Sequence, residues 1–200
     1  MSLKFSDELT MLLKKERDSP LTLANVLAET SERSFCLVII LLVFPFLFPM
    51  LPGMTTPLGS ACLLLSLQMA GGRHTPWLPA RIAQFQFSEK FITWLLNHLR
   101  QVIKIVEKVA KPRWSRFTQR KIVWRMNGLC ITWLALLLMS PVPLTNPLPT
   151  LGILTLAIAT VEMDGLLMLL GYGLVGFNTA LFGSIGYLLW RSPDLLQQLF

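Results

Sequence analysis

Charged residues are scarce in this 200-residue chain, and three long stretches contain none of them. These stretches cover residues 35–72, 127–161 and 165–190. Only 14% of the chain is charged, compared with about 25% in soluble domains. A helix needs about 20 apolar residues to cross a bilayer, and each stretch is longer than that. The pattern disfavours a soluble domain and predicts an all-α integral membrane protein.

The chain also lacks the patterns of a disulfide framework, a metal centre or an enzyme. Its three cysteines contain no CxxC pair, and its two histidines, His74 and His98, lie far apart. No nucleophile–base pair is present. The glycines of GYGLVG at 171–176 follow no strand, which argues against a nucleotide-binding loop. We therefore predict no enzymatic activity, no cofactor and no metal.

Positive charge is concentrated between the apolar stretches. Residues 73–126 carry twelve basic and two acidic residues, a net charge of +10, and their apolar residues recur at helical spacing. Short basic segments next to membrane helices stay in the cytoplasm. We therefore expect basic amphipathic helices against an anionic lipid surface. We do not expect nucleic acid as a partner, because the charges alternate with apolar residues.

Prolines interrupt two of the apolar stretches in a related way. An offset of 92 residues aligns Arg33 with Arg125 and pairs two prolines of FPFLFPMLPGMTTPLG with two of SPVPLTNPLPTLG. This agreement predicts an internal repeat of two broken-helix hairpins. The expected helix-break residues are Pro45, Pro49, Pro52, Gly53, Pro57, Pro141, Pro143, Pro147 and Pro149.

The apolar runs around these breaks are short for a membrane crossing. A run of 14 residues, the longest, extends about 21 Å as a helix, whereas the hydrocarbon core is about 30 Å thick. One interpretation is a pair of re-entrant hairpins whose broken ends meet a solute inside the bilayer. The other is a pair of ordinary helical hairpins with proline-rich extracytoplasmic turns.

Few polar residues lie within or beside the apolar stretches, and such residues are functional candidates. Each also has a structural interpretation: an arginine can reach lipid phosphate, an acid can pair with an arginine, and an amide can bond across helices. The candidates are Arg33, Gln68, Arg73, Arg125, Asn146, Glu162 and Asp164.

These features divide the chain into six parts. The last membrane segment is rich in glycine and either spans once or breaks near Gly171–Gly176. The predicted parts are a cytoplasmic helical tail (1–34), a first membrane hairpin (35–72), basic amphipathic helices (73–127), a second membrane hairpin (128–164), a C-terminal membrane helix (165–190) and a short tail (191–200).

Three motifs together resemble the ExoD family of bacterial membrane proteins. They are PWLP at 76–79, PVPLTNPLP at 141–149 and EMDG at 162–165, and the resemblance covers roughly residues 10–190. It implies a multi-pass protein of the bacterial cytoplasmic membrane connected with exopolysaccharide production. The family pattern leads us to expect an arginine where this chain has Met163, so a role for a charge between the two acids is in doubt.

Two functions are compatible with these observations. The chain is either a small transporter or translocase of a lipid-linked carrier or ion, or a non-transporting accessory or regulatory protein that docks to the exopolysaccharide machinery. The corresponding partners are the lipid bilayer, an anionic lipid or polyprenyl-linked saccharide, exopolysaccharide synthesis proteins, and a second copy of the chain in a homodimer.

Overall fold

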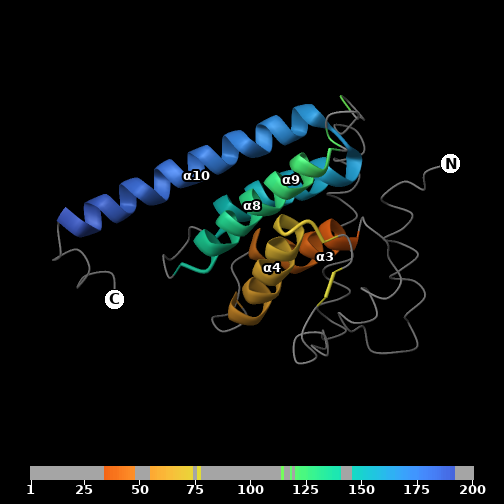
Figure 1. Cartoon of the computed structure of the whole chain (residues 1–200). Coiled ribbons are helices and arrows are strands. Elements are labelled where there is room, and N and C mark those ends of the chain that lie inside the picture. The colour runs from red at the N-terminus through yellow and green to blue at the C-terminus, as the bar shows by residue number, and fades with distance from the viewer. Residues whose placement is uncertain are drawn as a thin grey trace.

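The computed structural model describes residues 34–47, 55–73, 76–77, 114, 118, 120–140 and 146–191. Within these ranges the chain forms helices and no strand, which confirms the all-α prediction there (Figure 1). The elements are α3 (Ser34–Val43), the 3-10 helix η1 (Phe44–Leu47), α4 (Thr55–Ala70), α8 (Lys121–Leu138), α9 (Pro147–Glu162) and α10 (Gly165–Arg191).

Helix α3 is packed against α4 and α9. Every residue from Phe35 to Val43 is buried, and the sequence FCLVIILLV has no polar face. A helix that is apolar on all sides is typical of a completely enclosed position. The α-helix changes to the 3-10 helix η1 at Phe44, next to Pro45, because proline has no N–H to donate and disfavours the α conformation of the residue before it.

Helices α4 and α8 approach each other closely at a glycine. A Cβ on Gly128 would lie 2.4 Å from the backbone nitrogen of Ala70, so no larger residue fits without a shift of the backbone. Beside this contact Thr132 donates a hydrogen bond to Ser66 at 3.0 Å, and both side chains are buried. Small residues at such a crossing allow close packing without a hydrophobic driving force.

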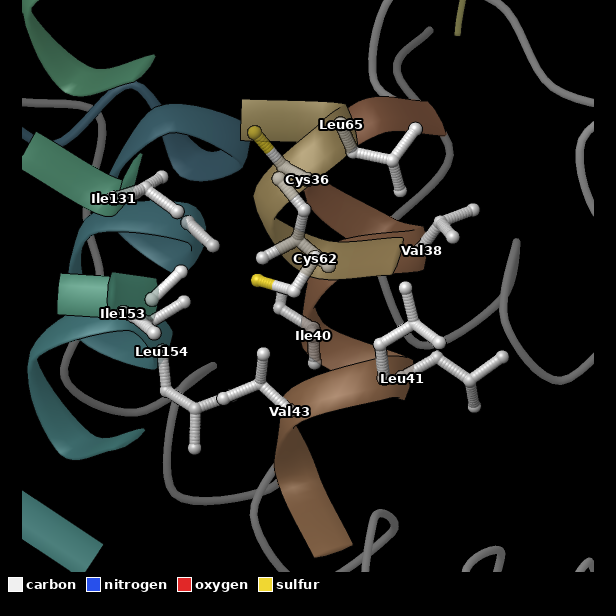
Figure 2. Packing of buried hydrophobic residues seen from close by; sticks show 14 of the residues in the cluster. Cys36, Val38, Ile40, Leu41, Val43, Cys62, Leu65, Ile131, Ile153 and Leu154 are labelled. Atoms are coloured by element: carbon white, nitrogen blue, oxygen red, sulfur yellow. The ribbon is translucent and has the colours of Figure 1, made fainter. Parts of the chain in front are cut away.

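Glycines also allow α9 to lie between α8 and α10. A Cβ on Gly152 would approach the Leu134 side chain to 2.7 Å, and one on Gly171 would approach the Leu156 side chain to 2.5 Å. Figure 2 shows Ile131, Ile153 and Leu154 on one side of α3, with Val38 and Leu41 on the opposite side. All of these labelled residues belong to one hydrophobic core.

The helices alternate in direction along the chain. Phe35 at the start of α3 meets Trp124 near the start of α8, with ring centroids 6.0 Å apart. Asn127 in α8 bonds Thr160 near the end of α9 and Tyr172 near the start of α10. We call the end where α3, α8 and α10 begin the basic end. The opposite end, where α4 and α9 begin, is the knot end.

Three of the described prolines at the knot end lie in the first turn of a helix, whereas Pro45 lies in η1, where α3 ends. Pro147 and Pro149 lie in the first turn of α9, and Pro57 lies in the first turn of α4. The first N–H groups of a helix have no partner within the helix, so proline loses no hydrogen bond there. In apolar surroundings proline therefore reduces the number of unpaired donors.

Helix α10 is continuous from Gly165 to Arg191, so it does not break near Gly171–Gly176. Its first half packs on α9, whereas its second half continues past α8 and α9 (Figure 1). At ~1.5 Å per residue its 27 residues extend about 40 Å. Among the described helices, Lys121–Leu138 and Gly165–Leu188 are long and apolar enough to cross a membrane.

The start of α8 differs from the predicted segment bounds, and several predicted segments lie outside the described residues. Helix α8 begins at Lys121, before the predicted start of the second hairpin at Gly128, and so takes Arg125 into the bundle. The N-terminal tail, most of the basic amphipathic segment and the short C-terminal tail lie outside the described residues. The same is true of Arg33, Pro49, Pro52, Gly53, Pro141 and Pro143.

Candidate functional site at the basic end

The last turn of α4 ends in a tight glycine motif. Gly72 has φ +82°, a conformation that glycine adopts without a Cβ clash. The N–H of Arg73 donates to the carbonyl of Gln68 at 3.0 Å, and the N–H of Gly72 donates to the carbonyl of Met69 at 2.9 Å. This is the Schellman arrangement, which satisfies the final carbonyls of a helix.

Gln68 holds the chain that follows this turn. Its Nε2 donates to the carbonyl of Trp77 at 2.6 Å, and the N–H of Trp77 donates to its Oε1 at 2.8 Å. The side-chain amide thus pairs with a backbone residue as a neighbouring strand would. The sequence predicted Gln68 as a candidate site or an interhelical bond. The structure shows two bonds from Gln68 in α4 to the backbone of the segment that follows the helix.

Two side chains of α8 attach to the same turn from the other side. The indole Nε1 of Trp124 donates to the carbonyl of Arg73 at 3.3 Å. The Nε of Arg125 donates to the carbonyl of Ala70 at 3.2 Å, where a cation also complements the negative end of the α4 dipole. We call residues 70–73 and 76–77 the braced turn, because the glycine motif, Gln68, Trp124 and Arg125 all hold it.

The braced turn presents a basic and aromatic surface. Arg73 and Trp77 are exposed, Trp77 by 60%. Arg120, Lys121 and Arg125 add three exposed cations at the start of α8. Tryptophan and basic residues together are typical of the headgroup level of a membrane. The arrangement can attract an anionic group.

The acids predicted as candidates lie at the joint between α9 and α10. Asp164 is buried, and its Oδ1 accepts hydrogen bonds from the N–H groups of Leu166 and Leu167 at 3.0 and 3.3 Å. It is therefore the N-cap of α10. The N–H of Asp164 donates to the carbonyl of Ala159, and this bond closes the last turn of α9. Glu162 is the last residue of α9 and is half-buried.

Met163, between these acids, has φ 54° and occupies the left-handed conformation that ends α9. A non-glycine residue is strained in this region. Its carbonyl accepts a hydrogen bond from Thr118 at 3.5 Å. The position at which the family pattern predicts an arginine is thus a helix C-terminus.

A polar network below the basic end was not among the predicted sites. Asn127 is completely buried, and its Nδ2 donates to Thr160 at 2.9 Å and to the sulfur of Met168 at 3.7 Å. Its Oδ1 accepts a hydrogen bond from Tyr172 at 2.5 Å. One asparagine therefore links α8, α9 and α10. The sequence signal was available, since Asn127 stands at the edge of a chargeless stretch.

Two asparagines lie toward the knot end. The carbonyl of Asn146, a predicted candidate, accepts bonds from the N–H and the hydroxyl of Thr150 at 3.2 and 2.7 Å. Asn178 was not predicted. It is completely buried, and its Nδ2 donates to the carbonyls of Leu174 at 2.8 Å and Leu148 at 3.4 Å. Its Oδ1 has no hydrogen-bond partner.

Taken together, the described residues form an all-helical bundle in which two helices are long and apolar enough to cross a membrane, with a basic, tryptophan-bearing surface at one end. The chain matches the family described as "Exopolysaccharide synthesis, ExoD" over residues 5–184, and it belongs to that family. This confirms the resemblance drawn from the sequence motifs.

Two relatives show how far the similarity extends. The chain is 32% identical to Protein ExoD of Rhizobium meliloti (strain 1021) over 199 residues, covering 98% of this chain and 82% of the relative. It is 29% identical to an uncharacterized protein of Synechocystis sp. over 155 residues, covering 77% of this chain and 73% of that one. No solved structure matches the chain.

Proposed function

We propose that this chain is a multi-pass protein of the bacterial cytoplasmic membrane that supports exopolysaccharide synthesis as a non-transporting accessory protein. The family description supplies the process. The two helices of spanning length support the membrane location. The basic end supports an orientation with the braced turn in the cytoplasm.

One observation favours an accessory role over transport. Polar side chains that the sequence offered as solute ligands have partners in the fold. Gln68 holds Trp77, and Asp164 caps α10. Arg125 contacts the last carbonyl of α4. The contacts of Asp164 and Arg125 stabilise helix ends, and that of Gln68 holds the segment after α4, so these groups act as braces. What they present outward is a rigid basic surface, which suits docking.

Site-specific photo-crosslinking in the producing cell tests this proposal. A photoreactive amino acid replaces Trp77 on the braced turn or, as a control, Trp190 near the end of α10, which is 88% exposed. We expect crosslinks from position 77 to identified proteins of the exopolysaccharide machinery and none of these from position 190. Absence of such crosslinks from position 77, in cells that still produce polysaccharide, would contradict a docking role.

Transport of a lipid-linked carrier or ion is the second candidate, and the internal repeat favours it. Helices α4 and α9 have 16 residues each, and both of their bounds differ by the predicted offset of 92. The same offset relates α3 to α8 and α4 to α9, so the contact between α4 and α8 corresponds to the contact between α9 and α3. Because α3 and α8 start at the same end, such a repeat would be parallel, as in some transporter families.

Flux measurements separate the two candidates. Purified chain in proteoliposomes is assayed for movement of a polyprenyl-phosphate carrier, protons and sodium. We expect no flux above that of empty liposomes. Flux that disappears in Asp164→Asn but persists in Ser184→Ala, an exposed control in the helix that Asp164 caps, would replace the accessory role with transport.

The knot end distinguishes re-entrant from spanning hairpins. Cysteine placed at Asn146, in a chain without its native cysteines, is exposed to a membrane-impermeant thiol reagent from outside the cell. Labelling indicates helices that cross the bilayer, and protection indicates hairpins that turn within it. We expect labelling, because α8 runs from the basic end to the knot end and is long and apolar enough to cross a membrane.

A further inference from the structure

The braced turn is held more firmly than the end of a helix requires. The Schellman motif satisfies the carbonyls of Gln68 and Met69, and Arg125 satisfies that of Ala70. Gln68 and Trp124 add hydrogen bonds to backbone groups of Trp77 and Arg73, outside the helix. Bonds of this kind fix the position of exposed residues before a ligand arrives, which removes part of the entropic penalty of binding.

Arg125 is oriented by the same turn. Its Nε bonds the carbonyl of Ala70, and its side chain crosses Gly72, where a Cβ would lie 3.5 Å from that Nε. The two terminal nitrogens of the guanidinium are not used in this bond, and they carry four of its five N–H groups. Neither Arg125 nor Arg73 forms an ion pair with any residue that the structure describes.

An exposed apolar stripe continues from Arg125 along α8. Residues three before and four after a helical residue share its face, so Ile122 and Leu129 lie on the same face as Arg125, followed by Leu136. These three side chains are 67%, 53% and 47% exposed. Leu129 and Leu136 continue from Arg125 toward the knot end, whereas Ile122 lies on its basic-end side. A cationic head above the track of Leu129 and Leu136 matches a ligand with an anionic group and a hydrocarbon chain.

We infer that Arg73 and Arg125 bind the phosphate of an anionic phospholipid whose acyl chain lies along this stripe of α8. Arginine presents a planar fork of donors that suits two phosphate oxygens. Trp77, held by Gln68, lies at the headgroup level beside the phosphate. This inference rests on the membrane location proposed above, but it requires neither docking nor transport.

Native mass spectrometry of the full-length protein released from nanodiscs tests the inference. The nanodiscs contain equal parts phosphatidylglycerol and phosphatidylcholine, and the retained lipids are counted. We expect Arg73→Gln together with Arg125→Gln to lower phosphatidylglycerol retention about tenfold and to leave phosphatidylcholine unchanged. The matched control is Arg191→Gln, an exposed arginine at the opposite end of α10, which retains lipid as the wild type does.

Two further variants keep the test decisive if the double variant folds poorly. Arg73→Gln alone keeps the Trp124 bond, because that bond uses the Arg73 carbonyl, and it should still lower retention severalfold. Arg125→Lys keeps the charge without the fork, and it should give an intermediate loss.

Three results would overturn the inference: equal retention in wild type and Arg73→Gln, an equal loss in Arg191→Gln, or displacement of the lipid by millimolar inorganic phosphate, which would indicate a site for soluble anions. Membrane location is scored separately by carbonate extraction of cell membranes. A protein that is extracted would refute the location, whereas an embedded protein that shows no lipid preference would refute only the lipid site.

Discussion

Helices α3 and α10 are both predominantly apolar but occupy opposite environments. Every residue of α3 from Phe35 to Val43 is buried. In α10 large apolar side chains such as Leu169, Tyr187 and Trp190 are exposed, and most of its second half has little cover. Apolar character alone therefore does not distinguish a core helix from one that faces lipid, since lipid tails are as apolar as leucine.

Individual glycines show the same difference between tightly packed and exposed parts of the molecule. Gly128, Gly152 and Gly171 lie where a Cβ would collide with a neighbouring helix. Gly173, Gly176, Gly183 and Gly186 in α10 have no atom of another group within 4 Å of a Cβ. Close contact, and not residue type, separates the packed part of the bundle from the exposed part. The following predictions test that separation, starting with the largest effect.

Replacing Gly128 by leucine should have the largest effect. The new side chain meets the backbone of Ala70, which cannot move aside as a flexible side chain can. We expect destabilisation of about 3 kcal/mol or more, the upper range for overpacking, measured by thermal unfolding of the full chain in nanodiscs. Gly183→Leu is the matched control and should change stability by less than about 0.5 kcal/mol. Similar losses in the two variants would show that α10 is packed as tightly as α8.

Truncation of a leucine should distinguish the two helices by a smaller amount. Leu42 in α3 is completely buried, whereas Leu170 in α10 is 56% exposed. We expect Leu42→Ala to destabilise the fold by about 2–5 kcal/mol, because it leaves a cavity. Leu170→Ala should lose less than about 1 kcal/mol. A larger loss at position 170 would indicate that a partner covers this face of α10 in the membrane.

The buried amide of Asn127 should contribute more than an exposed hydrogen bond to the same helix. Asn127→Ala removes three bonds and leaves the Tyr172 hydroxyl without its acceptor. We expect a loss of about 1–3 kcal/mol. Thr179→Val removes the exposed bond from Trp133 to α10 and should lose about 0.6 kcal/mol. The same unfolding assay compares them, and a larger loss for Thr179→Val would reverse the ranking of buried and exposed contacts.

The joint between the buried α9 and the exposed α10 should yield the smallest change, and in the stabilising direction. Met163 has φ 54°, so Met163→Gly removes the strain of a left-handed side-chain residue and should stabilise the fold by about 1 kcal/mol. Gly72→Ala, at φ +82°, should destabilise it by a similar amount. Unfolding midpoints of the two variants should therefore shift in opposite directions. A shift in the same direction would mean that the side chains, and not the backbone, decide stability at these turns.

Much of the fold could be predicted from local pattern. Chargeless stretches placed the apolar helices, and proline and glycine placed several of their ends, because these residues restrict or widen the backbone conformations nearby. The start of α8 at Lys121 was missed, since basic residues at the end of an apolar run were assigned to a separate helix. The sequence analysis listed Pro57, Pro147 and Pro149 as breaks and did not predict that each would lie in the first turn of a helix, where proline loses no hydrogen bond.

The candidate site was predictable only in part. Gln68, Arg73 and Arg125 were predicted, and the fold brings all three to the braced turn. Their chemistry was not predictable, because the contact of Arg125 with Ala70 joins residues 55 apart in the chain. Asn178, whose buried Oδ1 has no partner, carried the same signal as Asn127, a polar residue in a chargeless stretch, but it was not among the predicted candidates.

By itself, the sequence determined that the described part of the chain would be helical, apolar and basic at one end. These properties depend on residue type and on neighbours within a turn or two. Only the tertiary structure decided that α3 is enclosed, that α10 is exposed, and that Asn127 meets Tyr172 and Thr160. The reason is physical: where both the surroundings and the core are apolar, hydrophobicity does not select the buried faces, and only close contact between distant segments can do so.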